Sequence, residues 1–167
     1  APNDEINLKI ETVSKDNINS IFKKYNVPYE FDLLSVDIDS FDYWVTKEIL
    51  TQYSPRVVMV EVNVRFEPTE SWRLKDDPNW DWNGTKWYGA SPMAYKKMFN
   101  DAGYTPVYTH VDDLIAVRND VLKENGFSEP EWNYVYPHSN VSLYNTHNMG
   151  GTQELVTELN LDEWEEV

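Results

Sequence analysis

The stretch FDLLSVDIDSFDYWVTKEILTQYSPRVVMVEVN (residues 31–63) decides the fold of this chain. Residues 31–38 form a short apolar, β-branched run interrupted by polar residues, which predicts a buried strand. A segment of helical period follows and stops before Pro55, because a residue that precedes proline disfavours the helical conformation. Residues 56–62 predict a second buried strand. Strand, helix and strand in this order predict a βαβ unit, in which the two strands are parallel and joined by a right-handed crossover.

Oxygen-bearing side chains stand where both predicted strands end. Asp37 and Asp39 close the first strand, and Glu61 and Asn63 close the second. The carboxyl ends of parallel strands lie at the same edge of a sheet, where open α/β folds bind ligands, so we expect the four side chains to converge. Carboxylate and amide oxygens suit a hard cation such as Mg²⁺, Ca²⁺ or Mn²⁺. The four residues are therefore candidate metal ligands, and Asp37 and Asp39 are also candidate catalytic residues.

The same residues have simpler explanations. Asp39 could cap the helix that begins near Phe41. Glu61 could form an ion pair, for which the chain offers three arginines: Arg56, Arg65 and Arg118. The sequence alone leaves these alternatives open.

The segments before this unit predict one further strand and one further helix. Residues 8–13 alternate as a strand does. Ser14 is placed as an N-cap for a helix over residues 15–25, which has Ile18, Ile21 and Phe22 on one face.

Residues 64–90 predict a long aromatic loop, because turn signals are closely spaced in them. The loop directly follows the strand that carries Glu61 and Asn63, so we expect it to cover the site as a lid. With Trp44 and Asn63, the loop residues Trp87 and Tyr88 are candidate substrate-binding residues. The alternative is that its aromatic side chains fill the edge of the core.

The rest of the chain predicts a helix, a hairpin and a tail. Ser91 is a predicted N-cap, and Gly103 is a predicted glycine after the helix C-terminus. Residues 104–110 and 113–118 alternate as strands, and the short turn between them requires an antiparallel pair. Residues 123–167 are expected to form an irregular acidic tail that wraps the domain, with a short final helix over residues 154–164.

His110 closes the first strand of this hairpin and is a candidate general base, because histidine titrates near neutral pH. A histidine at a strand end can equally be a solvated surface residue. His138 and His147 show no spacing typical of metal ligands. Asn83 and Asn140 fit the N-glycosylation pattern, which is short enough to arise by chance.

The composition is that of a folded acidic protein. Aromatic residues make up 14% of the 167 residues, whereas disordered chains lack them. The formal net charge of −15 argues against nucleic acid as a partner, since nucleic-acid binding relies on basic residues. No apolar run approaches the roughly 20 residues of a membrane span. The chain has no cysteine, which excludes disulfides, and its composition does not distinguish a cytoplasmic from a secreted location.

Four blocks occur in an order that resembles a known family: residues 31–44, 55–63, 87–104 and 112–121. They resemble the second half of FkbM-like proteins, class I methyltransferases that use S-adenosylmethionine, and the resemblance covers about residues 8–122. It implies a Rossmann-like α/β fold with a mixed sheet of parallel strands and a terminal antiparallel hairpin. It also implies a metal site similar to that of metal-dependent O-methyltransferases, in which carboxylates hold a cation that orients a substrate hydroxyl.

Two features depart from the family pattern. The family's glycine after the second aspartate is Ser40 here, which alters the turn that positions Asp39. The glycine-rich turn that binds the cofactor is also missing, because none of the six glycines forms a Gly-x-Gly pattern near the N-terminus. Residues 1–122 therefore resemble a partial methyltransferase domain that lacks its cofactor-binding half. That half lies on another chain, has been removed by processing, or never existed in this protein.

Two functions follow from the sequence. The first is a part of an enzyme that methylates a hydroxyl of a sugar or small metabolite, with the cofactor half supplied elsewhere. The second is a non-catalytic module that retains the methyltransferase-like fold for binding or assembly. In both cases the sheet edge where the first half would lie is a liability in solution. We expect the tail or a partner chain to cover it.

Overall fold

The computed structural model describes residues 3, 5–80, 87–137 and 159–167. Its centre is a four-stranded sheet in the order β1-β2-β5-β4. The bounds of these strands are Leu33–Val36 for β1, Val57–Glu61 for β2, Tyr104–His110 for β4 and Asp113–Arg118 for β5. β1 and β2 are parallel, and β5 runs antiparallel to both of its neighbours, β2 and β4. The fold is therefore α/β with a mixed sheet, and both the parallel pair and the antiparallel hairpin are confirmed.

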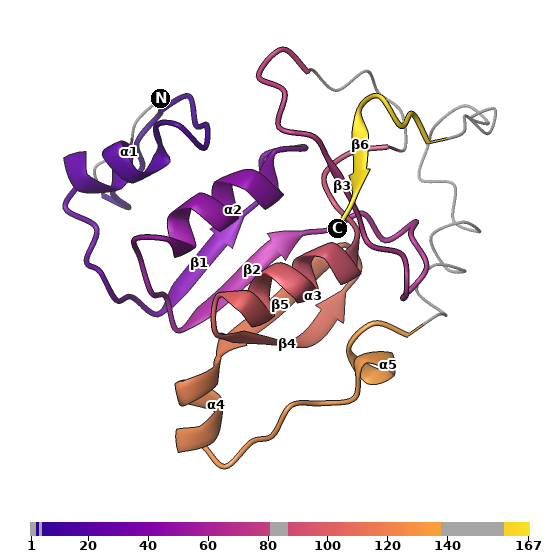
Figure 1. The fold of residues 1–167 in the computed structure, drawn as a ribbon. Helices are drawn as coiled ribbons and strands as arrows, with labels where there is room; N and C mark the ends of the chain where they lie inside the picture. Colours follow the sequence, from indigo (N-terminus) through magenta and orange to yellow (C-terminus); the bar gives the residue numbers. More distant parts are fainter. Residues whose placement is uncertain (1–2, 4, 81–86, 138–158) are drawn as a thin grey trace.

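Two helices cover one face of this sheet (Figure 1). They are α2 (Asp42–Leu50), which connects β1 to β2, and α3 (Pro92–Asp101), which precedes β4. The predicted cap of α3 is confirmed, because the Ser91 hydroxyl accepts a hydrogen bond from the Ala94 N–H at 3.2 Å. The helix ends before Gly103, whose φ of +82° is a conformation that favours glycine.

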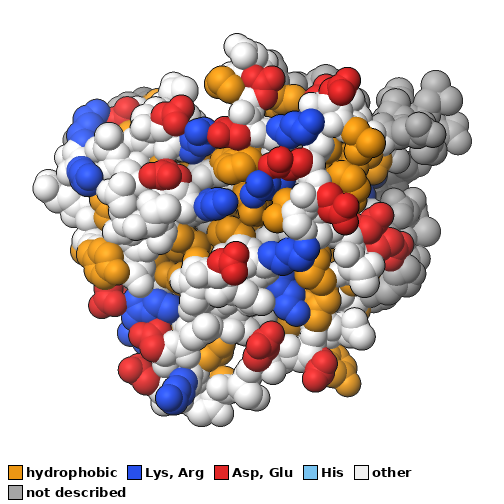
Figure 2. Space-filling model, viewed as in Figure 1, with side chains coloured by type: hydrophobic (Ala, Val, Ile, Leu, Met, Phe, Trp, Pro, Cys, Tyr) orange, Lys and Arg blue, Asp and Glu red, His pale blue; other side chains and the backbone are white. Residues whose placement is uncertain are grey.

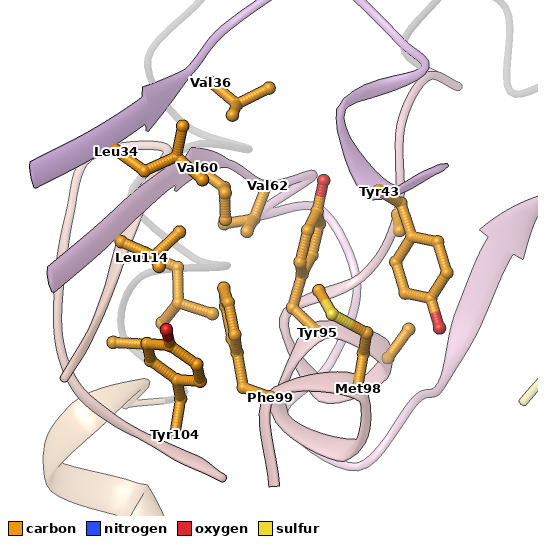
Figure 3. Packing of buried hydrophobic residues seen from close by; sticks show 14 of the residues in the cluster. Leu34, Val36, Tyr43, Val60, Val62, Tyr95, Met98, Phe99, Tyr104 and Leu114 are labelled. Carbon is orange, nitrogen blue, oxygen red and sulfur yellow. The ribbon is translucent and has the colours of Figure 1, made fainter. Parts of the chain in front are cut away.

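The core lies between the sheet and these helices. Figure 3 shows Tyr95 and Phe99 of α3 facing the sheet residues Val60 and Leu114. β1 is only half-buried: Leu34 and Val36 point into the core, whereas Leu33 is 57% exposed. The expectation of a buried strand therefore holds for one face of β1 only, because a strand with one covered face buries every second residue.

The N-terminal expectations are partly wrong. Residues 8–13 form no strand, and Leu8 makes only an isolated bridge with Asn3. The predicted helix exists as α1 (Ile18–Lys24) and packs against α2, but Asn17 and not Ser14 occupies its N-cap position. Alternation alone does not make a strand, because the backbone N–H and C=O groups of a strand need a neighbouring strand to bond.

Residues 64–90 are not merely a loop. They contain β3 (Trp72–Leu74), which pairs antiparallel with β6 (Trp164–Glu166) from the end of the chain. Side chains around this strand pair, most of them aromatic, form a second apolar cluster. Its members are Phe66, Leu74, Trp72, Trp80, Trp87, Trp164 and Leu159. Phe66 and the described tryptophans of this stretch thus pack with β6 in a cluster separate from the main core.

Two short helices follow the hairpin: α4 (Asn119–Glu124), which crosses the predicted start of the tail, and α5 (Trp132–Val135) within it. Tyr136 follows α5 and is fully buried, and its hydroxyl shares its one proton between the main-chain oxygens of Val64 and Phe66, at 2.8 and 3.0 Å. The predicted final helix is wrong for its described residues, because residues 161–163 form a turn and Trp164 begins β6. Among the described residues, no helix is long and apolar enough to cross a membrane. The residues Asn83, Asn140, His138 and His147 lie outside the described ranges.

Candidate functional site

Three of the four predicted ligand residues come together at one edge of the sheet. The register of β1 and β2 places Val36 opposite Val60, so Asp37 and Glu61 follow at the same end of two parallel strands. One carboxylate oxygen of each of Asp37, Asp39 and Glu61 lies within 4.8 Å of the other two. We call these three residues the acidic edge. Asp37 and Asp39 are exposed, and Glu61 is partly buried.

The turn between β1 and α2 has an unusual backbone. Asp39 has a φ of +56° and Ser40 a φ of +146°, both in the region that favours glycine. Ser40 is 2% exposed, and its hydroxyl has no hydrogen-bond partner among the described residues. Ser40 thus occupies a strained, buried position beside the acidic edge.

Asp42 holds this turn in place. Its carboxylate accepts hydrogen bonds from the Ile38 N–H at 2.7 Å and the Ser40 N–H at 2.8 Å, and the residue is 1% exposed. No side chain caps α2, so Asp39 does not have the capping role that the sequence left open. Its carboxylate instead lies beside those of Asp37 and Glu61.

Asn63 has a structural position behind the edge. It is fully buried, its amide nitrogen donates to the Tyr88 main-chain oxygen at 3.1 Å, and its amide oxygen accepts from the Arg65 N–H. The segment that Asn63 holds also contacts the turn, because a Cβ on Gly89 would lie 3.9 Å from the Ser40 oxygen. The blocks of residues 31–44, 55–63 and 87–104 therefore meet at this turn. The Asn63 amide binds main-chain groups there.

Burial and neighbouring carboxylates change the acidity of the edge. Burial is the largest cause that raises the pKa of Glu61 to about 8, followed by the charges of Asp42, Asp37, Asp112 and Asp39. Burial also raises the pKa of Asp42, against the effect of the two main-chain N–H groups that it binds. Glu61 therefore holds a proton at neutral pH unless a positive charge replaces it.

Sequence reasoning missed two acidic neighbours. Asp113 of β5 lies opposite Glu61 of β2, and burial is the main cause that raises its pKa, followed by the charges of Asp112 and Asp37. The hairpin was predicted, but its place beside β2 was not. Only the strand order brings Asp112 and Asp113 to the acidic edge.

A buried hydroxyl approaches the edge from the core side. Tyr95 of α3 is 0% exposed, and its hydroxyl has no hydrogen-bond partner among the described residues. Figure 3 shows this hydroxyl directed toward Val62, the residue after Glu61. Burial raises the pKa of Tyr95 well above its usual range, and the charges of Asp42 and Glu61 add to the effect.

His110 lies at the same end of the sheet but outside the acidic edge. It is exposed, and its partner in the hairpin is Asp113. β5 stands between His110 and Glu61, and two strand spacings place their main chains about 10 Å apart. Of the acidic residues on the neighbouring strands, Asp113 therefore lies nearest to His110.

The predicted substrate-binding aromatic residues have structural contacts. The Trp44 indole N–H donates to the Leu74 main-chain oxygen at 3.0 Å. Trp87 packs against Phe66, with ring centres 5.4 Å apart, in the second apolar cluster. Tyr88 is partly buried, and its main-chain oxygen is the one that Asn63 binds.

Comparisons with family models, curated proteins and solved structures find no match for this chain.

The described residues suit a divalent cation better than they suit the expected cofactor. Three carboxylates within reach of one another suit a hard divalent cation. The described residues do not suit S-adenosylmethionine. None of their glycines belongs to a Gly-x-Gly turn between a strand and the helix that follows it. Gly103 and Gly126 follow helices, and Gly89 packs beside Ser40.

Proposed function

We propose that the acidic edge binds a divalent cation and presents it to a hydroxyl-bearing acceptor, as the acceptor side of a methyltransferase-like protein. The observation that carries this proposal is the approach of Asp37, Asp39 and Glu61 to within 4.8 Å of one another at the carboxyl ends of two parallel strands. The mixed sheet with its terminal hairpin agrees with the fold that the family resemblance implies.

Each residue has a defined part in the proposed site. Asp37, Asp39 and Glu61 supply oxygen ligands, and Asp42 holds the turn that presents Asp39. A bound cation would lower the pKa of an acceptor hydroxyl and so make it a better nucleophile. Asn63 keeps the segment around Gly89 against the turn and acts as a positioning residue.

The methyl donor would be bound by a further part of the protein, on another segment or another chain. β1 is an edge strand, and among the described residues its only strand partner is β2. The described tail lies elsewhere, since β6 pairs with β3 and α5 packs on β4. The free edge of β1 is therefore where we place the cofactor-binding part.

A second candidate is a non-catalytic module that uses the same fold for binding. It is favoured by the lack of fit to S-adenosylmethionine among the described residues and by the structural contacts of Trp44 and Trp87. Calorimetric titration of this chain with S-adenosylmethionine separates the two roles. We expect no measurable heat from the chain alone, and clear binding would show that it is a free-standing cofactor-binding protein.

The cation site is tested by thermal melting with and without Mg²⁺, Ca²⁺ or Mn²⁺. We expect the cation to raise the Tm of the native chain, because a ligand that binds only the folded state stabilises it. Asp39→Asn should lose most of this increase. Asp32→Asn is the matched control, since Asp32 is an exposed carboxylate just before β1, at the other end of the strand from the acidic edge. Equal increases in Asp39→Asn and the native chain would refute the ligand set.

A further inference from the structure

A hollow of about 480 Å³ lies between α2, α3 and β3. Three cationic side chains line it, Lys47 from α2, Arg73 from β3 and Lys97 from α3, together with one carboxylate, Asp101 at the end of α3. In Figure 2, several Lys and Arg side chains, with Asp and Glu side chains among them, lie over the middle of the face on which Figure 1 shows α2 and α3. We call Lys47, Arg73 and Lys97 the basic hollow. Such a grouping stands out in a chain with a formal net charge of −15.

The indole of Trp44 brings two of these cations together. The guanidinium carbon of Arg73 lies 4.4 Å from the centre of a Trp44 ring, and the Lys47 ammonium lies 5.6 Å from it. Attraction to the aromatic face offsets part of the repulsion between the two cations. The Trp44 N–H is bound to the Leu74 oxygen, so the ring has a fixed place between α2 and β3.

Arg73 is held with donors to spare. Its Nε donates to Glu165 at 2.7 Å, and its Nη1 donates to the Tyr43 hydroxyl at 2.9 Å, while the side chain is 17% exposed. Among the described residues, its Nη2 has no acceptor and Lys47 has no carboxylate partner. Lys97 is already bound to the main-chain oxygen of Val167. The available donors are therefore Arg73 Nη2 and Lys47 Nζ.

We infer that the basic hollow binds the phosphate or carboxylate group of a small anionic molecule, through Arg73 Nη2 and Lys47 Nζ. A guanidinium whose plane is fixed by stacking and by two hydrogen bonds matches the oxygens of such a group with little loss of side-chain freedom. The hollow has the volume of a small-molecule site, and Leu50 and Met98 provide apolar contact for the rest of the ligand. This site is independent of the acidic edge.

The test is an NMR titration of the full chain with inorganic phosphate, and separately with citrate, at constant ionic strength. The signal observed is the indole N–H of Trp44, assigned by its loss in Trp44→Phe. We expect this signal to shift and saturate with at least one of the two anions, and the comparison shows whether phosphate or carboxylate is preferred. Lys47→Gln should weaken the affinity about tenfold, as expected when one charged hydrogen bond is removed.

Lys123→Gln is the matched control, because it removes an equal charge from α4, which does not line the hollow. It should leave the affinity unchanged. The inference is overturned if neither anion gives a saturable shift, if Lys47→Gln binds as tightly as the native chain, or if Lys123→Gln weakens binding as much as Lys47→Gln. Lys47 is exposed, so its replacement leaves the core intact. Asp39→Asn should not alter this titration, which separates the outcome from that of the cation site.

Discussion

The Glu61 carboxyl lies at the end of β2, where its burial, and after it the charges of neighbouring carboxylates, raise its pKa to about 8. Its ordinary pKa is 4.5, so between pH 4.5 and about 8 the folded protein keeps a proton that the unfolded chain has released. Stability therefore falls as pH rises through this range. If Glu61 binds a cation, the cation must displace this proton, so binding should strengthen with pH over the same interval.

Glu61→Gln should remove this pH dependence. We expect the mutant to gain stability relative to the native chain, and the gain to be larger at pH 8 than at pH 5, because the amide carries no charge that burial and neighbouring carboxylates oppose. The measurement is the urea midpoint of both proteins at the two pH values in the absence of divalent cations. The same difference at both pH values would contradict the raised pKa.

Ser40→Gly should stabilise the protein by about 1 kcal/mol. Glycine removes the strain of a side chain at φ +146° and a buried hydroxyl without a partner, and these gains exceed the entropy that glycine costs. The measurement is the free energy of unfolding in urea. Ser35→Gly, at an exposed position in β1, is the control and should destabilise by about 0.5–1 kcal/mol. A loss of stability in both mutants would refute the strain at Ser40.

At the scale of elements, the connection from β1 to α2 depends on Asp42. Its carboxylate binds two main-chain N–H groups in a turn with two residues of positive φ, and no side chain caps the helix. We expect Asp42→Ala to cost about 2–3 kcal/mol in urea unfolding, because it leaves two main-chain donors unsatisfied. Asp42→Asn retains one acceptor oxygen and should lose less. An Asp42→Ala protein within 0.5 kcal/mol of the native chain would mean that water replaces the carboxylate.

At the scale of the whole molecule, the feature with the clearest consequence is the edge of β1, whose only strand partner among the described residues is β2. An edge strand presents unpaired N–H and C=O groups that can bond to another strand. We expect the isolated chain to self-associate as its concentration rises, with an increase in the mass given by solution X-ray scattering. Leu33→Lys should reduce this increase, because a charge on an edge strand opposes pairing.

The control for this experiment is Tyr134→Lys, which adds the same charge at an 82% exposed site on α5, an element that packs on β4 at the opposite side of the sheet. It should leave self-association unchanged. A monomer mass at every concentration, or equal effects of both substitutions, would show that the β1 edge does not recruit a strand.

The local pattern of the sequence was enough to predict the βαβ unit, the antiparallel hairpin, the Ser91 cap and the turn at Gly103. Each of these depends on neighbouring residues, through apolar period, capping chemistry or the conformational freedom of glycine. The approach of Asp37 to Glu61 followed as well, because parallel strands bring their carboxyl ends to one edge.

Only the tertiary structure decided which side chains are free to act. Asn63, Trp44 and Trp87 looked like site residues, but their polar or aromatic groups contact segments that no local pattern places beside them. Asp113 reaches Glu61 through the strand order, and β3 finds its partner β6 about ninety positions further along the chain. Periodicity reports which face of an element is buried, whereas the partner of a side chain depends on the distant segment that packs against that face.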